Sequence, residues 1–303
     1  DEWLFLSDLN YIKTAGWTAA IEKNIGLTYL LFAYPLSFIF SDYIALRLVN
    51  ILLWAAFYFY CWRWGAVKNN LYYFYVTFVS TFGFFLLGTN DTLFIVAMLI
   101  FSNEAYKQIE DKENPSMPLM WCALIVAFFT RELIYIYIPL VLLSVYLIAQ
   151  KKVNLLQKWY IPTVLFAILI AINMPCIEKN HRLSYDDKKP PTGVRSTWPQ
   201  RQYLAQLLVN DGKIANNTHQ SWQETDAYLK LHGENSLPKT TGAGIFFDYK
   251  LTVIEFFKDF VSSIVLSIRQ TGLILIFVFS FVLLAIFKRK ITTNLLLPFA
   301  SLF

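Results

Sequence analysis

Six charged residues in this chain lie beside apolar segments, where their side chains could do chemistry at a membrane surface. They are Asp1, Glu2, Arg47, Asp91, Arg131 and Arg269. Charge at the edge of hydrocarbon costs free energy, so such residues are usually paired or functional. A carboxylate can act as a general base or bind a hard divalent cation, and an arginine can hold a phosphate. Each role also has a plainer alternative, which the sequence leaves open.

The acidic residues have two readings each. Asp1 and Glu2 are adjacent and could hold a divalent cation or supply a catalytic base, or they could be a solvated pair in a loop. Asp91, between Asn90 and Thr92, could be a second ligand in the same site. It could equally be the N-cap of the helix that follows.

The arginines also have two readings. Arg47 and Arg269 each lie about one helical turn inside an apolar run. There they could grip a phosphate through paired N–H donors, or extend to the interface as membrane arginines commonly do. Arg131 precedes Glu132, and the two could form an ion pair that ties off two helix ends or could contact a substrate. We favour the ion pair.

Composition indicates a polytopic membrane protein. The chain has 303 residues, of which 56% are hydrophobic and 16% are charged, whereas about a quarter of the residues in a soluble domain are charged. The net charge of +5 does not indicate nucleic-acid binding, because the basic residues cluster in short loops between apolar runs. The cysteines Cys61, Cys122 and Cys176 have no spacing typical of disulfide frameworks or zinc sites.

Apolar runs of spanning length predict an all-α transmembrane bundle. The predicted spans are residues 44–62, 71–87, 92–106, 118–130, 133–149, 159–175 and 263–287. Before them, residues 3–25 have the pattern of an interfacial helix. Residues 27–40 are short and contain Pro35, so we interpret them as interfacial or re-entrant in preference to a full span. Basic clusters at 63–68, 151–158 and 288–290 fall on one side of this topology, which the positive-inside rule makes cytoplasmic.

The chain therefore divides into four predicted parts. Residues 1–43 form a first extracytoplasmic loop with interfacial helices, and residues 44–176 form transmembrane helices. Residues 177–262 are too long and polar for an ordinary connection and predict a small helical extramembrane insert. Residues 263–303 return to the membrane. Because the chain begins without Met and stops inside an apolar run, we interpret it as a fragment that lacks both ends.

Two features of the insert are specific. Ser221 and Glu224 form a capping box that predicts the start of a helix running to Gly233. Trp198 and Trp222 could form a platform for stacking a sugar or could be the core of the insert. We favour the core.

Five segments in order resemble the GT-C superfamily of integral-membrane glycosyltransferases, which includes protein O-mannosyltransferases and the aminoarabinose transferases of lipid A. They are the acidic pair 1–2, the segment 29–36 with its proline, Ala45-Leu46-Arg47-Leu48-Val49-Asn50, Asn90-Asp91-Thr92-Leu93, and Phe128-Phe129-Thr130-Arg131-Glu132 before a span with Pro139. The resemblance covers roughly residues 1–150. At the last of these segments the family often has Thr-Lys-Gly, whereas this chain has Thr130-Arg131-Glu132.

The resemblance implies roles for particular residues. Asp1 or Glu2 would be the catalytic base or a ligand of a divalent metal, Mg or Mn, and Asp91 would contribute to the same site. Arg47 would contact the phosphate of the lipid-linked substrate, and Arg131 and Arg269 are further candidates for that contact.

The resemblance also implies the reaction. A sugar would move, with inversion, from a polyprenyl-phosphate donor in the lipid bilayer to a glycan, lipid or protein acceptor. The site would face outward from a bacterial inner membrane, and no nucleotide or nucleic acid would take part.

Two other classes of function remain open. A transporter or flippase-like protein would have ionisable groups at mid-span, and the sequence pattern places nearly all charge at one face instead. A non-catalytic membrane assembly protein could keep this fold without the chemistry. If the chain is the transferase, Asp1 or Glu2, Asp91 and Arg47 should converge at the outer face.

Overall fold

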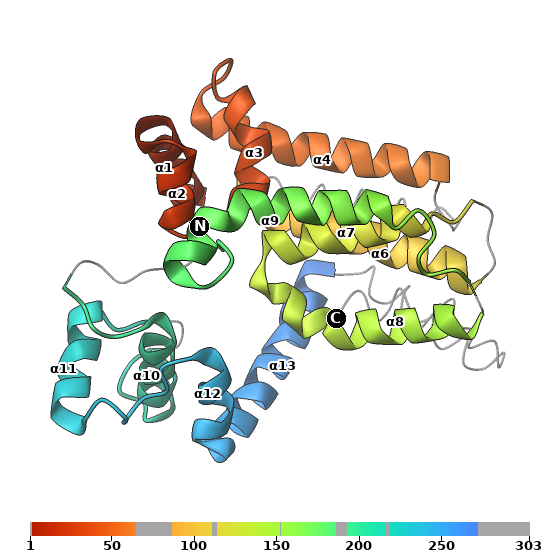
Figure 1. The fold of residues 1–303 in the computed structure, drawn as a ribbon. Helices are drawn as coiled ribbons and strands as arrows, with labels where there is room; N and C mark the ends of the chain where they lie inside the picture. The colour runs from red at the N-terminus through yellow and green to blue at the C-terminus, as the bar shows by residue number, and fades with distance from the viewer. Residues whose placement is uncertain are drawn as a thin grey trace. The chain divides into compact units, whose positions relative to one another are not determined.

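The computed structural model describes residues 2–64, 87–110, 114–151, 153–185, 193–215 and 218–271. At residues 241, 263–264 and 266–271 it describes the backbone alone. All regular elements in these ranges are helices, which confirms the predicted all-α class for this part of the chain (Figure 1). The described residues fall into two compact units, 2–185 and 193–271.

Three short helices begin the first unit: α1 (Glu2–Ala15), α2 (Trp17–Glu22) and α3 (Leu27–Leu36). Phe5, Leu9 and Ile12 recur at helical spacing on α1 and are buried in a cluster with residues of α3 and α4. With ten residues, α3 is only about 15 Å long. Since a bilayer core is about 30 Å thick, α3 is too short to cross it.

Longer helices form the rest of this unit. They are α4 (Asp42–Trp64), α6 (Asp91–Ile109), α7 (Met117–Thr130), the 3₁₀-helix η2 (Glu132–Tyr137), α8 (Ile138–Gln150) and α9 (Tyr160–Asn180). Figure 1 shows α6, α7 and α9 side by side. Within the described ranges, three segments are long and apolar enough to span a membrane: Asp42–Trp64, Glu132–Gln150 and Tyr160–Asn180. Residues 71–86 of the predicted span 71–87, and residues 272–287 of the predicted span 263–287, lie outside these ranges.

Interhelical hydrogen bonds show which helix ends lie together. At one end, the Asn90 side chain donates to the Thr130 carbonyl at 3.2 Å, joining the start of α6 to the end of α7. At the other end, the Trp121 indole donates at 3.0 Å to the carbonyl of Leu155, in the loop that joins α8 to α9. The predicted outer turns at 88–91 and 131–132 therefore share one end of the helices.

The second unit contains α10 (Trp198–Asn210), α11 (Trp222–His232), α12 (Thr241–Phe247) and α13 (Tyr249–Thr271). The predicted capping box at Ser221 and Glu224 is confirmed and begins α11. The buried core of the unit consists of Tyr203, Leu204, Leu229, Leu237 and Leu251. A single helix, α13, runs without a break through the predicted boundary at 262 and 263.

The predicted role of Trp198 and Trp222 in that core is wrong. Both indoles are only half-buried and lie outside the buried cluster, with their ring centroids 6.0 Å apart. The Arg201 guanidinium lies 5.2 Å from each ring. An arginine that stacks on aromatic faces keeps its charge near water, so this arrangement belongs at the surface of the unit.

Candidate functional site

The first element of the candidate site is a two-point ion pair between Glu2 and Arg47. The Nε of Arg47 donates to Oε1 of Glu2 at 2.8 Å, and its Nη2 donates to Oε2 at 3.0 Å. Glu2 lies in the first turn of α1, where the helix dipole favours a negative charge. The Arg47 guanidinium also lies 4.1 Å from the ring centroid of Tyr43, one turn earlier on α4.

Arg47 sets the protonation state of Glu2. Its hydrogen bonds hold the pKa of the Glu2 carboxyl below its usual range, although partial burial acts in the opposite direction. The carboxylate is therefore ionised at neutral pH and is already saturated with donors. A general base works best with a pKa near the working pH. Glu2 would become a better base once Arg47 engaged another anion.

The second element is an ion pair between Asp91 and Arg131. Asp91 is the first residue of α6 and Asn90 is the N-cap, so the predicted alternative of Asp91 as an N-cap is wrong. The Thr89 hydroxyl donates to Oδ2 of Asp91 at 3.0 Å. Arg131 caps the C-terminus of α7, so the pair with Asp91 joins two helix ends.

The turn at residues 87–90 connects these two pairs. The N–H of Gly88 donates to Oε1 of Glu2 at 2.8 Å, three positions before Asp91. The side chain of Asn50 on α4 donates to the Thr89 carbonyl at 3.2 Å and to the Leu87 carbonyl. The predicted outer-face residues Glu2, Arg47, Asp91 and Arg131 therefore all lie at this turn.

Gly88 is a site residue that sequence reasoning missed. A Cβ at this position would lie 2.6 Å from Cβ of Leu46 and 3.0 Å from Oε1 of Glu2. Only glycine lets the turn approach α4 and the carboxylate this closely. The available signal was that a glycine opens the predicted turn Gly88-Thr89-Asn90-Asp91.

Two predicted residues are not placed by the structure. Asp1 lies outside the described residues, and so does the side chain of Arg269.

The described residues at the turn do not fit a divalent metal. Both oxygens of Glu2 already accept hydrogen bonds, and the nearest group is the Arg47 cation. A metal ion there would be repelled by the guanidinium unless that side chain moved. The described residues also contain no cluster of three or more His, Cys, Asp or Glu side chains suited to a metal.

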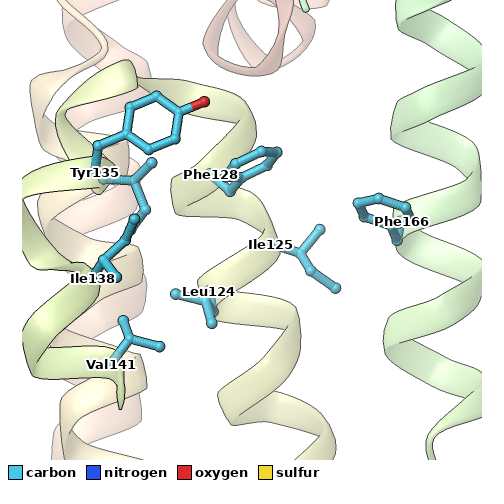
Figure 2. Close-up of a pocket in the computed structure, with 8 residues that line it drawn as sticks. Leu124, Ile125, Phe128, Tyr135, Ile138, Val141 and Phe166 are labelled. Atoms are coloured by element: carbon cyan, nitrogen blue, oxygen red, sulfur yellow. The ribbon is translucent and has the colours of Figure 1, made fainter. Parts of the chain in front are cut away.

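An apolar groove of about 300 Å³ lies among α7, η2, α8 and α9. Figure 2 shows Ile125 and Phe128 of α7 pointing toward Phe166 of α9, with Ile138 and Val141 of α8 beside α7. Phe128 precedes Arg131 by three residues and the lining residue Tyr135 follows it by four. The groove therefore begins at the end of the helices where the ion pairs lie.

A second charged cluster, which sequence reasoning missed, is buried near the opposite ends of α6 and α7. Glu104 accepts bonds from the Tyr60 hydroxyl, from Nζ of Lys107 at 2.8 Å and from the Ser116 N–H at 2.7 Å. Asn103 donates to the Tyr60 hydroxyl at 2.5 Å. Because both carboxylate oxygens are bonded, the cluster acts as a clamp that joins α4, α6 and the start of α7.

This clamp is a buried charged pair at the opposite end of the helices, whereas the sequence pattern predicted nearly all charge at the outer face. Glu104 lies inside the predicted span 92–106, and both Glu104 and Lys107 are buried. Their spacing of three residues on one helix was the available signal for an ion pair. The partner Tyr60 comes from α4, 44 positions earlier, and no local pattern reveals it.

Comparisons of the chain with protein-family models, curated proteins and solved structures find no match. Function is therefore inferred from the residues of the site and their surroundings. The inference draws on the two ion pairs at the 87–90 turn and on the apolar groove that begins beside Arg131.

Proposed function

We propose that the chain is part of a multi-pass membrane glycosyltransferase, which transfers a sugar from a polyprenyl phosphate to an acceptor hydroxyl at the outward face of a bacterial inner membrane. One observation carries the proposal: two carboxylate–arginine pairs meet at one turn, and an apolar groove begins at the same end of the helices. A lipid-linked sugar phosphate has the same layout, with an anionic group next to a long apolar chain.

The arginines suit the phosphate group of such a donor. The side chains of Arg47 and Arg131 are both 38% exposed, so each can still reach a ligand. A guanidinium presents N–H donors in a fixed fork that matches phosphate oxygens as well as it matches a carboxylate. A bound phosphate would therefore compete with Glu2 and Asp91 for these donors.

The carboxylates suit the proton transfer. When phosphate takes up the donors of Arg47, the pKa of Glu2 rises toward its usual range and the carboxylate gains basicity. Glu2 then removes the proton of the acceptor hydroxyl while the oxygen of that hydroxyl attacks the anomeric carbon of the sugar. The bond from that carbon to the phosphate oxygen breaks, and its electron pair leaves with the phosphate. The arginines stabilise the negative charge that develops there.

The apolar groove suits the polyprenyl chain. Its lining residues on α7, η2, α8 and α9 are hydrophobic or aromatic. Tyr160–Asn180 and Glu132–Gln150, which border it, are among the segments with spanning character. A chain in this groove would remain at bilayer depth while its phosphate reached Arg131.

The test is sugar transfer by the purified full-length protein in lipid nanodiscs, with a polyprenyl-phosphate sugar as donor. We expect Glu2→Gln to reduce the transfer rate about 100-fold or more, the usual contribution of a general base. Asp91→Asn should also reduce the rate, because Asp91 positions Arg131. Asp42→Asn is the matched control, because Asp42 forms an ion pair with Lys13 near the same end of α4. It should retain activity within about threefold, since an exposed pair contributes little. Unchanged transfer in both site variants would contradict the proposal.

A further inference from the structure

The second unit contains a groove of about 320 Å³ between α10, the segment around Pro238, α12 and the start of α13. Ligand pockets begin at about 300 Å³, so the groove has room for a small ligand. Trp198, Gln202 and Gln206 line it from α10 at intervals of four residues, which places them on one helix face. Thr240 and Glu255 line it from other segments.

One residue of the groove lining has a buried hydroxyl without a hydrogen-bond partner among the described residues. This hydroxyl belongs to Tyr203, which lines the groove and is only 7% exposed. Its ring packs edge-on against Phe247, with centroids 5.4 Å apart, so the phenol is held in place. A buried hydroxyl without a partner costs free energy, about 1–3 kcal/mol. Because this hydroxyl is closed off from solvent, the ring of Tyr203 and not its hydroxyl lines the groove.

We propose that this groove binds a neutral mono- or disaccharide unit of a glycan. The amides of Gln202 and Gln206 can each donate and accept hydrogen bonds, as sugar hydroxyls do. Trp198 supplies an aromatic surface for the apolar face of a sugar ring. Trp222 and Arg201, which stack near Trp198, hold that indole in position before a ligand arrives.

The charge of the lining argues against an anionic ligand. Glu255 is the charged residue among those that line the groove. Its Oε1 accepts from the Asn210 side chain at 2.8 Å and from Nζ of Lys258 at 3.3 Å. A phosphate or carboxylate ligand would be repelled by Glu255, and no cation in the lining would offset that repulsion. An uncharged polyol can instead form hydrogen bonds with the polar side chains of the lining. The proposal depends on residues of the second unit alone and not on the transferase activity.

The first experiment measures binding by the full chain in nanodiscs that contain no sugar-based detergent. Saturation-transfer NMR is recorded with maltose, cellobiose and diacetylchitobiose, and with an uncharged capped tripeptide as the comparison. We expect saturation of the ring protons of at least one disaccharide. Failure of all three disaccharides to bind would overturn the proposal, and so would selective binding of the peptide.

Variants then locate the binding. Gly244 lines the groove, so Gly244→Phe should fill it and abolish the signal. Gly244→Ala is the matched control, because its Cβ would meet Pro238 at 3.6 Å, an ordinary contact. Circular dichroism and the thermal midpoint check that both variants fold. Undiminished binding in a folded Gly244→Phe protein would place the ligand elsewhere and overturn the proposal.

Two conservative variants provide a second test that does not depend on filling the groove. Gln206→Ala should weaken saccharide binding about threefold to tenfold, through the loss of one hydrogen bond. Tyr203→Phe should leave binding unchanged, because the Tyr203 hydroxyl is closed off from solvent. Tyr203→Phe should not lower the thermal midpoint of the free protein, because the hydroxyl it removes has no partner among the described residues. Unchanged affinity of Gln206→Ala would contradict the proposed lining.

Discussion

The guanidinium of Arg47 holds both carboxylate oxygens of Glu2, at 2.8 and 3.0 Å, across 45 positions of the chain. This contact joins the first turn of α1 to the second turn of α4. The Gly88 N–H completes it by donating to the same carboxylate. The contact is therefore part of the packing of the N-terminal helices. It is also one of the two carboxylate–arginine pairs of the proposed site.

The close approach of Gly88 predicts a large effect from a small substitution. Gly88→Ala would bring its Cβ to 2.6 Å from Cβ of Leu46, so the turn must shift. We expect a loss of about 1–3 kcal/mol in the free energy of unfolding and a fall in sugar transfer of at least tenfold. Gly242→Ala is the control, because no atom lies within 4 Å of its added Cβ. Equal stability and activity of the two variants would contradict the proposed geometry.

The pair also predicts how stability depends on pH. Arg47 lowers the pKa of Glu2 below its ordinary value of 4.5, so the stabilisation is fully present above that pH. It is lost as the pH falls through the folded-state pKa. Glu2→Gln should therefore be less stable than the wild type at pH 7, by about 1 kcal/mol because water screens the half-exposed arginine. The difference in unfolding free energy between Glu2→Gln and the wild type should shrink below pH 4.5. A difference that stays constant from pH 7 to 3 would contradict the lowered pKa of Glu2.

Asp8 on α1 predicts the opposite dependence. Burial raises its pKa to about 6 from an ordinary 3.8, and Lys23 only partly offsets this. Ionisation is thus disfavoured in the folded state, and the folded protein loses stability as the pH rises from about 4 to 6. Asp8→Asn should raise the thermal midpoint at pH 7 and leave it unchanged near pH 3.5. A lower midpoint at pH 7 would show that the ionised side chain has a stabilising partner.

The buried clamp predicts strong coupling between Glu104 and Lys107. Lys107→Met should cost about 3–5 kcal/mol of unfolding free energy, because it leaves a buried carboxylate without its cation. The double variant Glu104→Leu with Lys107→Met should recover much of that loss. Lys179→Met is the control, since Lys179 pairs with Glu22 at an exposed position and should cost less than about 1 kcal/mol. If the losses of unfolding free energy from the two single substitutions simply add in the double variant, Glu104 and Lys107 do not form a coupled buried pair.

Local patterns predicted much of the helical structure. Apolar periodicity predicted α1, the capping box predicted the start of α11, and the short proline-containing run predicted that α3 is no ordinary span. The alternation of spans also predicted that Arg47, Asp91 and Arg131 share one end of the helices. These features depend on residues close in sequence or on the lengths of apolar runs.

Other features depend on contacts between distant segments. The sequence showed the turn at Gly88 but not that its backbone touches Glu2 and Leu46. It showed Glu104 but not the Tyr60 hydroxyl that helps to bury it. It showed two tryptophans but not that Arg201 lies against both of their rings, outside the buried core. Burial and pairing of this kind arise only when the helices pack.

The most direct test of the proposed site is the binding of a polyprenyl phosphate, without a sugar, to the full-length protein in nanodiscs. Phosphorus-31 NMR of the bound lipid would be compared for the wild type, Arg47→Gln, Arg131→Gln and Lys13→Gln. Lys13 is the control cation, because it pairs with Asp42 outside the two site pairs. We predict a shifted phosphate resonance in the wild type and in Lys13→Gln, and its loss in both arginine variants. Equal binding by all four proteins would contradict the assignment of these arginines to the substrate phosphate.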